Sequence, residues 1–277
     1  MCGIEVVWSW ACTSISLWIS GYGGNRSDVI RFAPSPPAIA APCWGGGWAI
    51  LAPLLILAVY TFIFTVVFRS RWGEGELGPW GAVLNLFAGL ITFNRFAEVV
   101  NEAPILVAAR RNFVAKVVFP LQILSVVSVL TALFRAIINV MILLTFQLLI
   151  VRSLSFSLLW LPMVWLPLLM IALALSWLMS SLGVFLRDLP QVTSLLAMLL
   201  VFMSAVFYPL SPLPISMRLA FSLNPIAELV HQTRLVLIQA EQPNPTYLLI
   251  ALVLSFVAAE AAIRFFERIR HSVASVI

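Results

Sequence analysis

Charged side chains are scarce in this sequence of 277 residues. Only 10% of the residues are Asp, Glu, Lys or Arg, whereas about a quarter are charged in an ordinary globular domain. Hydrophobic residues make up 62%, and several uncharged stretches reach the roughly 20 residues that a membrane-spanning helix requires. The alternating ten-residue pattern of membrane barrel strands is not evident. The composition therefore predicts an all-α integral membrane protein with several spans.

Lysine and histidine are rarer still, and this limits the chemistry that the chain can perform. The only lysine, Lys116, follows Ala115, so the Gly-Lys pair with which a P-loop binds nucleotide phosphates is missing. The two histidines, His231 and His271, are far apart in sequence, which argues against a His-rich metal site or a catalytic triad. Glu228 and His231 share a helical face, but no second such pair completes a di-iron site. We expect no catalytic residue, cofactor or metal in this chain.

The N-terminal segment lacks recognisable organisation. All three cysteines lie within the first 43 residues and form no CxxC pair, so they predict neither a disulfide framework nor a zinc site. A cleaved signal is not expected, because Glu5 precedes Arg26, the first basic residue. We therefore separate an atypical segment, 1–46, from a membrane domain, 47–277.

Long apolar runs predict six membrane spans. They are 50–68, a run that begins near Ala82, 117–150, 154–185, 189–207 and 247–263. In the second run, Arg95 and Glu98 are expected to be interfacial. The fourth span is expected to start after Pro162 and Pro167. Asp188 is expected to cap the fifth.

The stretch between the fifth and sixth spans differs from the rest. Three prolines in 208–214 break the helix, and two short amphipathic segments follow, 217–223 and 226–238. Asn224 and Pro225 divide them as an N-cap followed by proline at the first helical position. Two re-entrant or interfacial helices are predicted. Their polar residues Glu228, His231 and Arg234 form either the polar face of an interfacial helix or a gate that faces the outer leaflet.

Positive charge has one main concentration, the stretch 101–120 between the second and third spans. It holds Arg110, Arg111 and Lys116. The positive-inside rule favours a cytoplasmic position for this loop, for the Arg187-Asp188 turn and for the basic C-terminus. The other basic residues behind the net charge of +5 are scattered singly along the sequence, so nucleic acid is not an expected partner.

Arg135 lies near the middle of the third predicted span. A bare guanidinium there costs at least about 2.5 kcal/mol, so it must have partners. Thr131 and Asn139 lie one helical turn away on the same face. This face is either a structural polar cluster between helices or the lining of a hydrated conduit. Aromatic side chains that include Tyr208 are suited to stack sugars, although membrane core or belt positions explain most of them.

Three stretches in this order resemble one protein family. They are RNFVAKVVFPLQILSVVSVLTALF (111–134), FLRDLPQV (185–192), and MSAVFYPLSPLP with NPIAELVHQTR (203–214 and 224–234). They are similar to the permeases of ABC-2 type polysaccharide exporters, above all those for O-antigen and lipopolysaccharide, with capsule and teichoic-acid exporters as relatives. The resemblance covers about 47–277. The family's basic amphipathic N-terminal helix has no counterpart in 1–44, so either that element is lost or the reading frame is shifted there.

The resemblance implies a homodimer of six-span protomers in the bacterial inner membrane. Two separate ATPase subunits would bind ATP and Mg²⁺, and the substrate would be a polysaccharide linked to a polyprenyl diphosphate. Carried over to this sequence, the ATPase-coupling helix is 103–116, with Ala103, Leu106, Arg110, Arg111, Asn112 and Lys116. The cytoplasmic turn is Arg187 with Asp188. The periplasmic gate, 216–240, contains Asn224, Pro225, Glu228, His231 and Arg234.

Two other classes of function remain as alternatives. A membrane-embedded transferase acting on a polyprenyl-linked glycan needs carboxylates or a metal at the membrane surface. The acidic residues here are few and separated, without a DxD or DDxxD cluster. A carrier driven by an ion gradient needs an acidic residue in mid-membrane. Glu260, near the end of the sixth predicted span, is a poor candidate.

Overall fold

The computed structural model describes residues 48–63, 78–107, 122–152, 155–208, 221 and 224–276. The chain divides into two units, Met1–Ile56 and Leu57–Ile277. In the smaller unit, the described residues belong to the first part of helix α3, Trp48–Phe62. The larger unit contains all the other described elements, and within these described ranges every element is helical. The all-α class expected from composition is confirmed.

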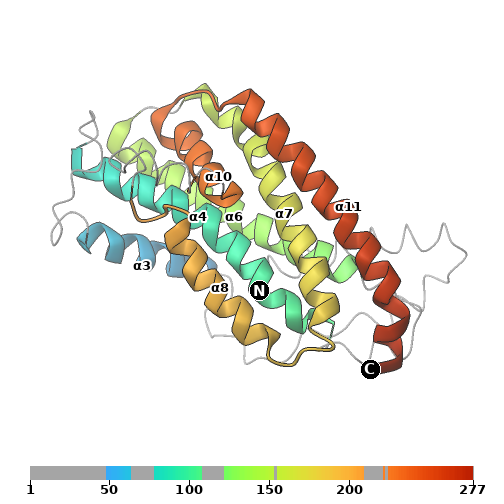
Figure 1. Ribbon diagram of the computed structural model, residues 1–277. Helices are drawn as coiled ribbons and strands as arrows, with labels where there is room; N and C mark the ends of the chain where they lie inside the picture. Colours follow the sequence, from blue (N-terminus) through green and yellow to red (C-terminus); the bar gives the residue numbers. More distant parts are fainter. Residues whose placement is uncertain are drawn as a thin grey trace, which may run out of the picture. The chain divides into compact units, whose positions relative to one another are not determined.

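Six longer or apolar helices and three shorter elements make up the described chain (Figure 1). They are α3, α4 (Gly78–Leu106), α6 (Gln122–Val151), the 3₁₀ helix η4 (Phe156–Trp160), α7 (Leu161–Leu182), α8 (Leu189–Met203), α10 (Pro225–Arg234), the π-helical segment η5 (Leu235–Gln239) and α11 (Pro245–Val276).

Four of these helices are long and apolar enough to cross a membrane. They are Trp80–Leu106, Gln122–Ile150, Phe156–Leu182 and Pro245–Ile269. Two shorter apolar helices, Leu51–Phe62 and Leu189–Met203, coincide with the first and fifth predicted spans. The multi-span architecture is therefore confirmed, and the count of six stays a prediction. The first short amphipathic segment, 217–223, lies outside the described residues except for Phe221.

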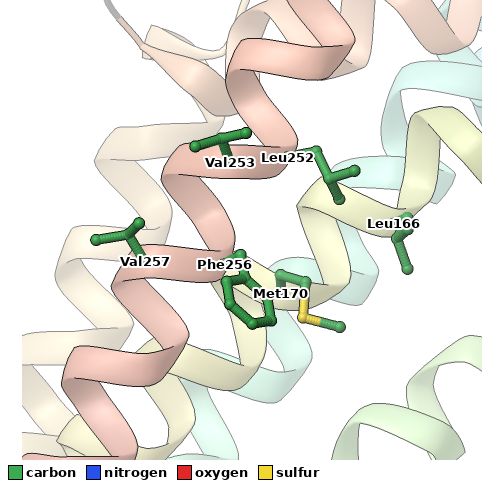
Figure 2. Close-up of a pocket in the computed structure, with 6 residues that line it drawn as sticks. All are labelled: Leu166, Met170, Leu252, Val253, Phe256 and Val257. Atoms are coloured by element: carbon green, nitrogen blue, oxygen red, sulfur yellow. The ribbon is translucent and has the colours of Figure 1, made fainter.

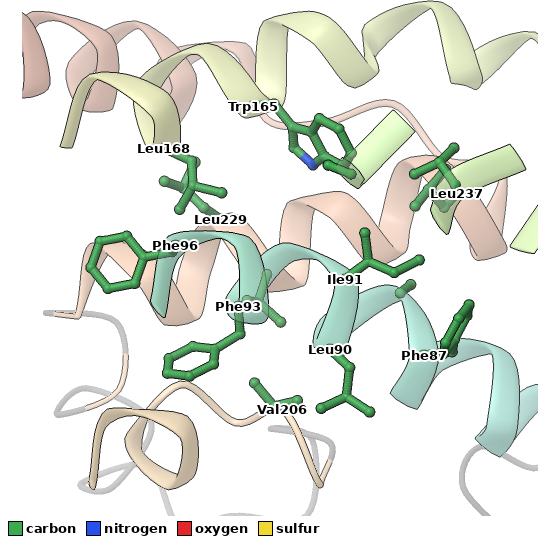
Figure 3. Close-up of a cluster of buried hydrophobic side chains, with 14 of the residues drawn as sticks. Phe87, Leu90, Ile91, Phe93, Phe96, Trp165, Leu168, Val206, Leu229 and Leu237 are labelled. Carbon is green, nitrogen blue, oxygen red and sulfur yellow. The ribbon is translucent and has the colours of Figure 1, made fainter. Parts of the chain in front are cut away.

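Helix α4 is the centre of the larger unit. Its membrane-length window is 72% buried inside the protein, against 28–39% for the other three spans, and it contacts α6, α7, α8 and α10. Figure 3 shows α4 carrying Phe87, Ile91 and Phe96 into a cluster shared with Trp165 of α7 and Leu229 of α10. Because lipid tails are as apolar as these side chains, close packing rather than transfer from water favours this arrangement in a membrane.

Helices α7 and α11 lie side by side over much of their length (Figure 1). Between them is an apolar hollow of about 360 Å³, lined by Leu166 and Met170 from α7 and by four residues of α11 (Figure 2). All six lining side chains are apolar, so the hollow offers no side-chain hydrogen bond that would orient a sugar. It is a feature of an apolar surface rather than a polar substrate site.

The fourth predicted span begins earlier than its prolines suggested. Pro162 lies in the first turn of α7, where its missing N–H costs little, and Pro167 lies inside the helix. The expectation that the span starts after both prolines is therefore wrong. Asp188 does occupy the N-cap position of α8, with Pro190 in the first turn, but its side chain makes no capping hydrogen bond. Its backbone carbonyl instead accepts from Gln191 and Val192.

Helices α4 and α7 approach each other closely where α4 ends. A Cβ added to Gly183, the C-cap of α7, would lie 2.8 Å from Pro104 Cα in α4 and closer still to the Pro104 carbonyl oxygen. Glycine is therefore needed at position 183 because the neighbouring backbone occupies the space of a side chain. A second hydrophobic cluster, which includes Val107, Trp177 and Phe266, packs the same end of the unit.

Candidate functional site

Asn224 begins α10 in the way that the sequence predicted. Its Oδ1 accepts a hydrogen bond from the Ile226 N–H at 3.0 Å, and Pro225 takes the first helical position. The same side chain also donates through Nδ2 to the Met203 carbonyl at 3.1 Å. Asn224 therefore starts one helix and ties it to the end of another, α8.

Arg234, at the end of α10, is the most unusual side chain of this region. Only 5% of the residue is exposed. Its guanidinium donates from Nε to the Asn85 carbonyl at 2.9 Å, from Nη1 to the Ala205 carbonyl at 2.9 Å and from Nη2 to the Val206 carbonyl at 2.5 Å. Three backbone carbonyls from two distant segments thus converge on one cation. The interpretation of Arg234 as part of the polar face of an interfacial helix is wrong, because the side chain is buried.

Gly89 makes room for this guanidinium. It follows Asn85 by one helical turn of α4, and a Cβ placed there would lie 2.6 Å from Arg234 Nη2. Burial lowers the pKa of Arg234 to about 10, which still leaves the side chain charged at neutral pH. Charge-assisted hydrogen bonds of this kind are stronger than neutral ones. Arg234 therefore fixes the α10 end and the chain after α8 against α4.

The other polar residues of α10 connect it to α11. Gln232 donates to Glu228 Oε1 at 2.7 Å and accepts from the Asn244 N–H at 3.0 Å. Asn244 in turn accepts from the backbone of Thr246 at 3.1 Å, where α11 begins. We call Asn224, Gln232, Arg234 and Asn244 the α10 network. Glu228 lies at its edge, and His231 is half-buried on the neighbouring turn.

Tyr208 lies near the α10 network, whereas Arg135 of α6 lies against a more distant part of α4. The Tyr208 hydroxyl donates to the Phe202 carbonyl at 2.6 Å, at the end of α8. Arg135 contacts Glu98 of α4, whereas Arg234 contacts Asn85 of α4. Asn85 and Glu98 are thirteen positions apart, or about 20 Å along a helix. The predicted conduit residues Thr131, Arg135, Asn139 and Tyr208 are thus not brought together in one place.

Arg135 does have the partner that its position in a span demanded. Its Nη1 bonds Glu98 Oε1, and Arg95 Nη1 bonds Glu98 Oε2 at 2.5 Å. We call Arg95, Glu98 and Arg135 the α4–α6 charge cluster. The hydroxyl of Thr131 is bonded within its own helix, to the Val127 carbonyl at 2.8 Å. A polar cluster between helices is therefore confirmed for Arg135, and a conduit role stays a prediction.

Only the beginning of the predicted coupling helix lies in the described chain. Ala103 and Leu106 belong to the last turn of α4 and are buried within the protein. Arg110, Arg111, Asn112 and Lys116 lie outside the described residues. Arg187 and Asp188 form an exposed turn between α7 and α8, as the sequence predicted.

Sequence reasoning missed Asn85, Gly89, Glu98 and Gln232 as members of these sites. Asn85 contributes its backbone carbonyl, and Gly89 contributes the space left by its missing side chain. Neither contribution depends on a side chain that the sequence would reveal. A glycine inside an otherwise apolar span was the only available signal. For Glu98, the signal was its own charge within a span, together with that of Arg135, since buried charges need opposite charges nearby.

The described chain is therefore that of a polytopic helical membrane protein whose buried polar groups join helices to one another. The chain belongs to the ABC-2 type transporter family, whose model matches residues 43–238. It is similar to an O-antigen export system permease protein RfbA of Myxococcus xanthus, with 28% identity over 232 residues, 83% of this chain and 86% of the relative. A protein of the same name from Klebsiella pneumoniae is 22% identical over 254 residues, 91% of this chain and 92% of the relative.

Proposed function

We propose that this chain is the permease subunit of an ABC exporter that moves a polyprenyl-diphosphate-linked polysaccharide out of the cytoplasm. Two copies in the bacterial inner membrane would work with two ATPase subunits. The observation that carries the proposal is the similarity to O-antigen export permeases over more than four fifths of both chains. The four membrane-length helices agree with it. The sequence contains no Gly-Lys pair for a P-loop, so ATP and Mg²⁺ would be bound by the partner.

Energy would enter through the segment between α4 and α6. An ATPase that closes on ATP can shift the permease only through contacts that differ between its two states. Both flanks of this segment are firmly attached. Pro104 on one side packs against Gly183 of α7. On the other side, the Gln122 carbonyl accepts from Trp177 Nε1 at 3.1 Å and its side chain donates to Glu267 of α11 at 3.3 Å. A push on the segment would therefore reach α4, α6, α7 and α11 together.

Helix α4 would carry this displacement to the α10 network. It runs without interruption from Gly78 to Leu106, and its Asn85 carbonyl is held by Arg234. A helix moves as a nearly rigid element, so a shift at its Leu106 end would change the position of Asn85 and of the α10 end bonded to it. In this mechanism the α10 network is the outward gate, and Arg234 is its link to α4.

Association with a partner ATPase gives a first test of this proposal. The full-length chain would be expressed with a candidate ABC ATPase from the same organism and purified through a tag on the permease. We expect the two proteins to co-purify and the complex to hydrolyse ATP. An ATPase that is recovered equally well from cells lacking the permease, or that never associates with it, would contradict the proposal.

A further inference from the structure

A polar strip runs along the otherwise buried surface of α4. Asn94, Glu98 and Glu102 lie four positions apart on one helical face; Asn94 and Glu102 are exposed and Glu98 is half-buried. Arg135 of α6 lies against the middle of the strip, with 38% of its side chain exposed. Both helices are membrane-length spans. Because an ionised side chain is costly in lipid, this strip must face a polar group rather than acyl chains.

The charges of the α4–α6 cluster do not balance. Arg95 and Arg135 are both cations, and they share the single carboxylate of Glu98. Arg95 Nε is buried and makes no hydrogen bond within the described part of the chain. The next carboxylate along the strip, Glu102, accepts from the Ser128 hydroxyl at 3.1 Å. The cluster thus holds one positive charge in excess and at least one guanidinium N–H that still needs an acceptor.

We propose that Arg95, Glu98 and Arg135 form a binding site for the phosphate group of an amphiphile, namely the diphosphate of the lipid carrier. The assignment to the exported carrier rests on the proposed function, and the phosphate chemistry rests on the cluster itself. Guanidinium groups bind phosphate oxygens in paired, charge-assisted hydrogen bonds. A diphosphate would neutralise the excess charge and bind the Arg135 guanidinium, which is the more exposed of the two. Its polyprenyl chain would lie along the apolar surface of the spans.

The position of the cluster within a membrane-length helix favours a lipid-borne phosphate. Glu98 precedes the end of α4 at Leu106 by eight positions, or about 12 Å along a helix. The diphosphate of a carrier lipid is held at the membrane by its polyprenyl tail, whereas a free phosphate ion has no such attachment. Glu98 then has a definite role, because its carboxylate competes with the phosphate for both guanidinium groups.

Because Glu98 and the phosphate compete, replacing Arg135 and replacing Glu98 should have opposite effects on phosphate binding. Arg135→Gln removes a phosphate donor and should weaken binding about tenfold or more. Glu98→Gln removes the competing carboxylate and should strengthen binding. If the Arg135–Glu98 ion pair were purely structural, Arg135→Gln and Glu98→Gln would both destabilise the fold, and neither the wild type nor the variants would prefer a phosphate-bearing lipid.

The experiment measures binding of a short-chain polyprenyl diphosphate to the purified full-length chain in detergent, without the ATPase. The matched probes are the same polyprenol without phosphate, inorganic diphosphate and phosphatidylglycerol. The variants are Arg135→Gln, Arg135→Lys and Glu98→Gln, with Arg264→Gln as the control, since Arg264 pairs with Glu260 on the exposed face of α11. The elution profile and melting temperature of each variant show whether it is folded, and Arg135→Lys provides a second variant that keeps the charge.

We expect tight binding of the diphosphate, weak binding of the alcohol and of inorganic diphosphate, and no change in Arg264→Gln. Arg135→Lys should bind between wild type and Arg135→Gln. Equal binding of alcohol and diphosphate, or weaker binding in folded Glu98→Gln, would overturn the phosphate site. Equal binding of phosphatidylglycerol would overturn its assignment to the carrier. Because no ATPase is involved, a failure here is distinct from a failure of ATP-driven export, which would overturn the proposed function.

Discussion

Single residues in this protein act mainly as connectors between segments that are far apart in sequence. Arg234 is the clearest case, since its guanidinium bonds carbonyls of Asn85, Ala205 and Val206. A planar fork of N–H donors suits three separate acceptors, which the compact ammonium of lysine cannot reach together. The residue is buried, so losing it would leave carbonyl groups without a partner and without water.

Removing the guanidinium should therefore destabilise the protein. We expect Arg234→Gln to lower the free energy of unfolding by about 2–4 kcal/mol, and Arg234→Lys to recover only part of the loss. The melting temperature of the purified protein in detergent measures this effect. His231→Gln, a neighbouring change at a half-buried position, is the control and should alter stability little. An Arg234→Lys variant as stable as wild type would show that charge alone suffices.

Gly89 offers a sharper test of the same contact, because its effect should change sign. In the wild-type background, Gly89→Ala forces its new methyl group against Arg234 and should destabilise the protein. In an Arg234→Ala background the space is open, so the same change should be neutral or stabilising by up to about 1 kcal/mol through better helix propensity. The four melting temperatures of this double-mutant cycle measure the coupling. Additive effects would mean that the contact is not made.

At the scale of elements, α4 is the helix around which the others are arranged. It contacts the α10 network near Asn85, the charge cluster at Glu98 and α7 at Pro104. Helix α4 contains three charged residues, Arg95, Glu98 and Glu102, and is nevertheless the most buried of the four spans. Contacts with neighbouring helices, rather than with lipid, surround most of its surface. In lipid alone, these charges would be costly.

The crossing of α4 and α7 should tolerate no side chain at position 183. Gly183→Ala places its Cβ against the backbone of Pro104 rather than against a movable side chain, so the two helices must separate. We expect a loss of several kcal/mol or failure to fold, read from expression level and melting temperature. Unlike the Gly89 case, Pro104→Ala should not rescue this variant, because the clash is with the main chain. Rescue would place the contact on the proline ring instead.

Local features of these elements could be predicted from the sequence, and long-range ones could not. The cap formed by Asn224 and Pro225 depends only on neighbouring residues, and it is present. The burial of Arg234 depends on carbonyls 149 and 29 positions away, about which residue type says nothing. The start of α7 lies before Pro162 and Pro167 rather than after them, because proline at 162 is well accommodated in a first helical turn.

At the scale of the whole molecule, the proposed function makes the chain one part of a transporter whose energy source is another protein. The segment between α4 and α6 is where we expect that protein to act, since its flanks are tied to α7 and α11. Arg110 and Arg111 lie in this segment. Their positive charge would bind an acidic groove of the ATPase as well as hold the loop in the cytoplasm.

Reversing both charges should separate ATP hydrolysis from transport. We expect the Arg110→Glu, Arg111→Glu double variant to reach the membrane and to lose export, while the ATPase subunit keeps its basal hydrolysis. Export can be followed in cells by the amount of surface polysaccharide. Arg264→Gln on α11 is the control and should export normally. Normal export by the double variant would count strongly against a coupling role for this segment.

The most direct measurement is transport by the purified protein in liposomes. Vesicles containing this chain would be loaded with a lipid-linked polysaccharide, and movement of the glycan across the bilayer would be followed by its access to an added glycosidase. Transport is predicted when the partner ATPase and Mg-ATP are both present, and neither without the ATPase nor with a non-hydrolysable ATP analogue. Transport that proceeds without any ATPase, or that follows an imposed ion gradient instead of ATP, would contradict the assignment of this chain as an exporter permease.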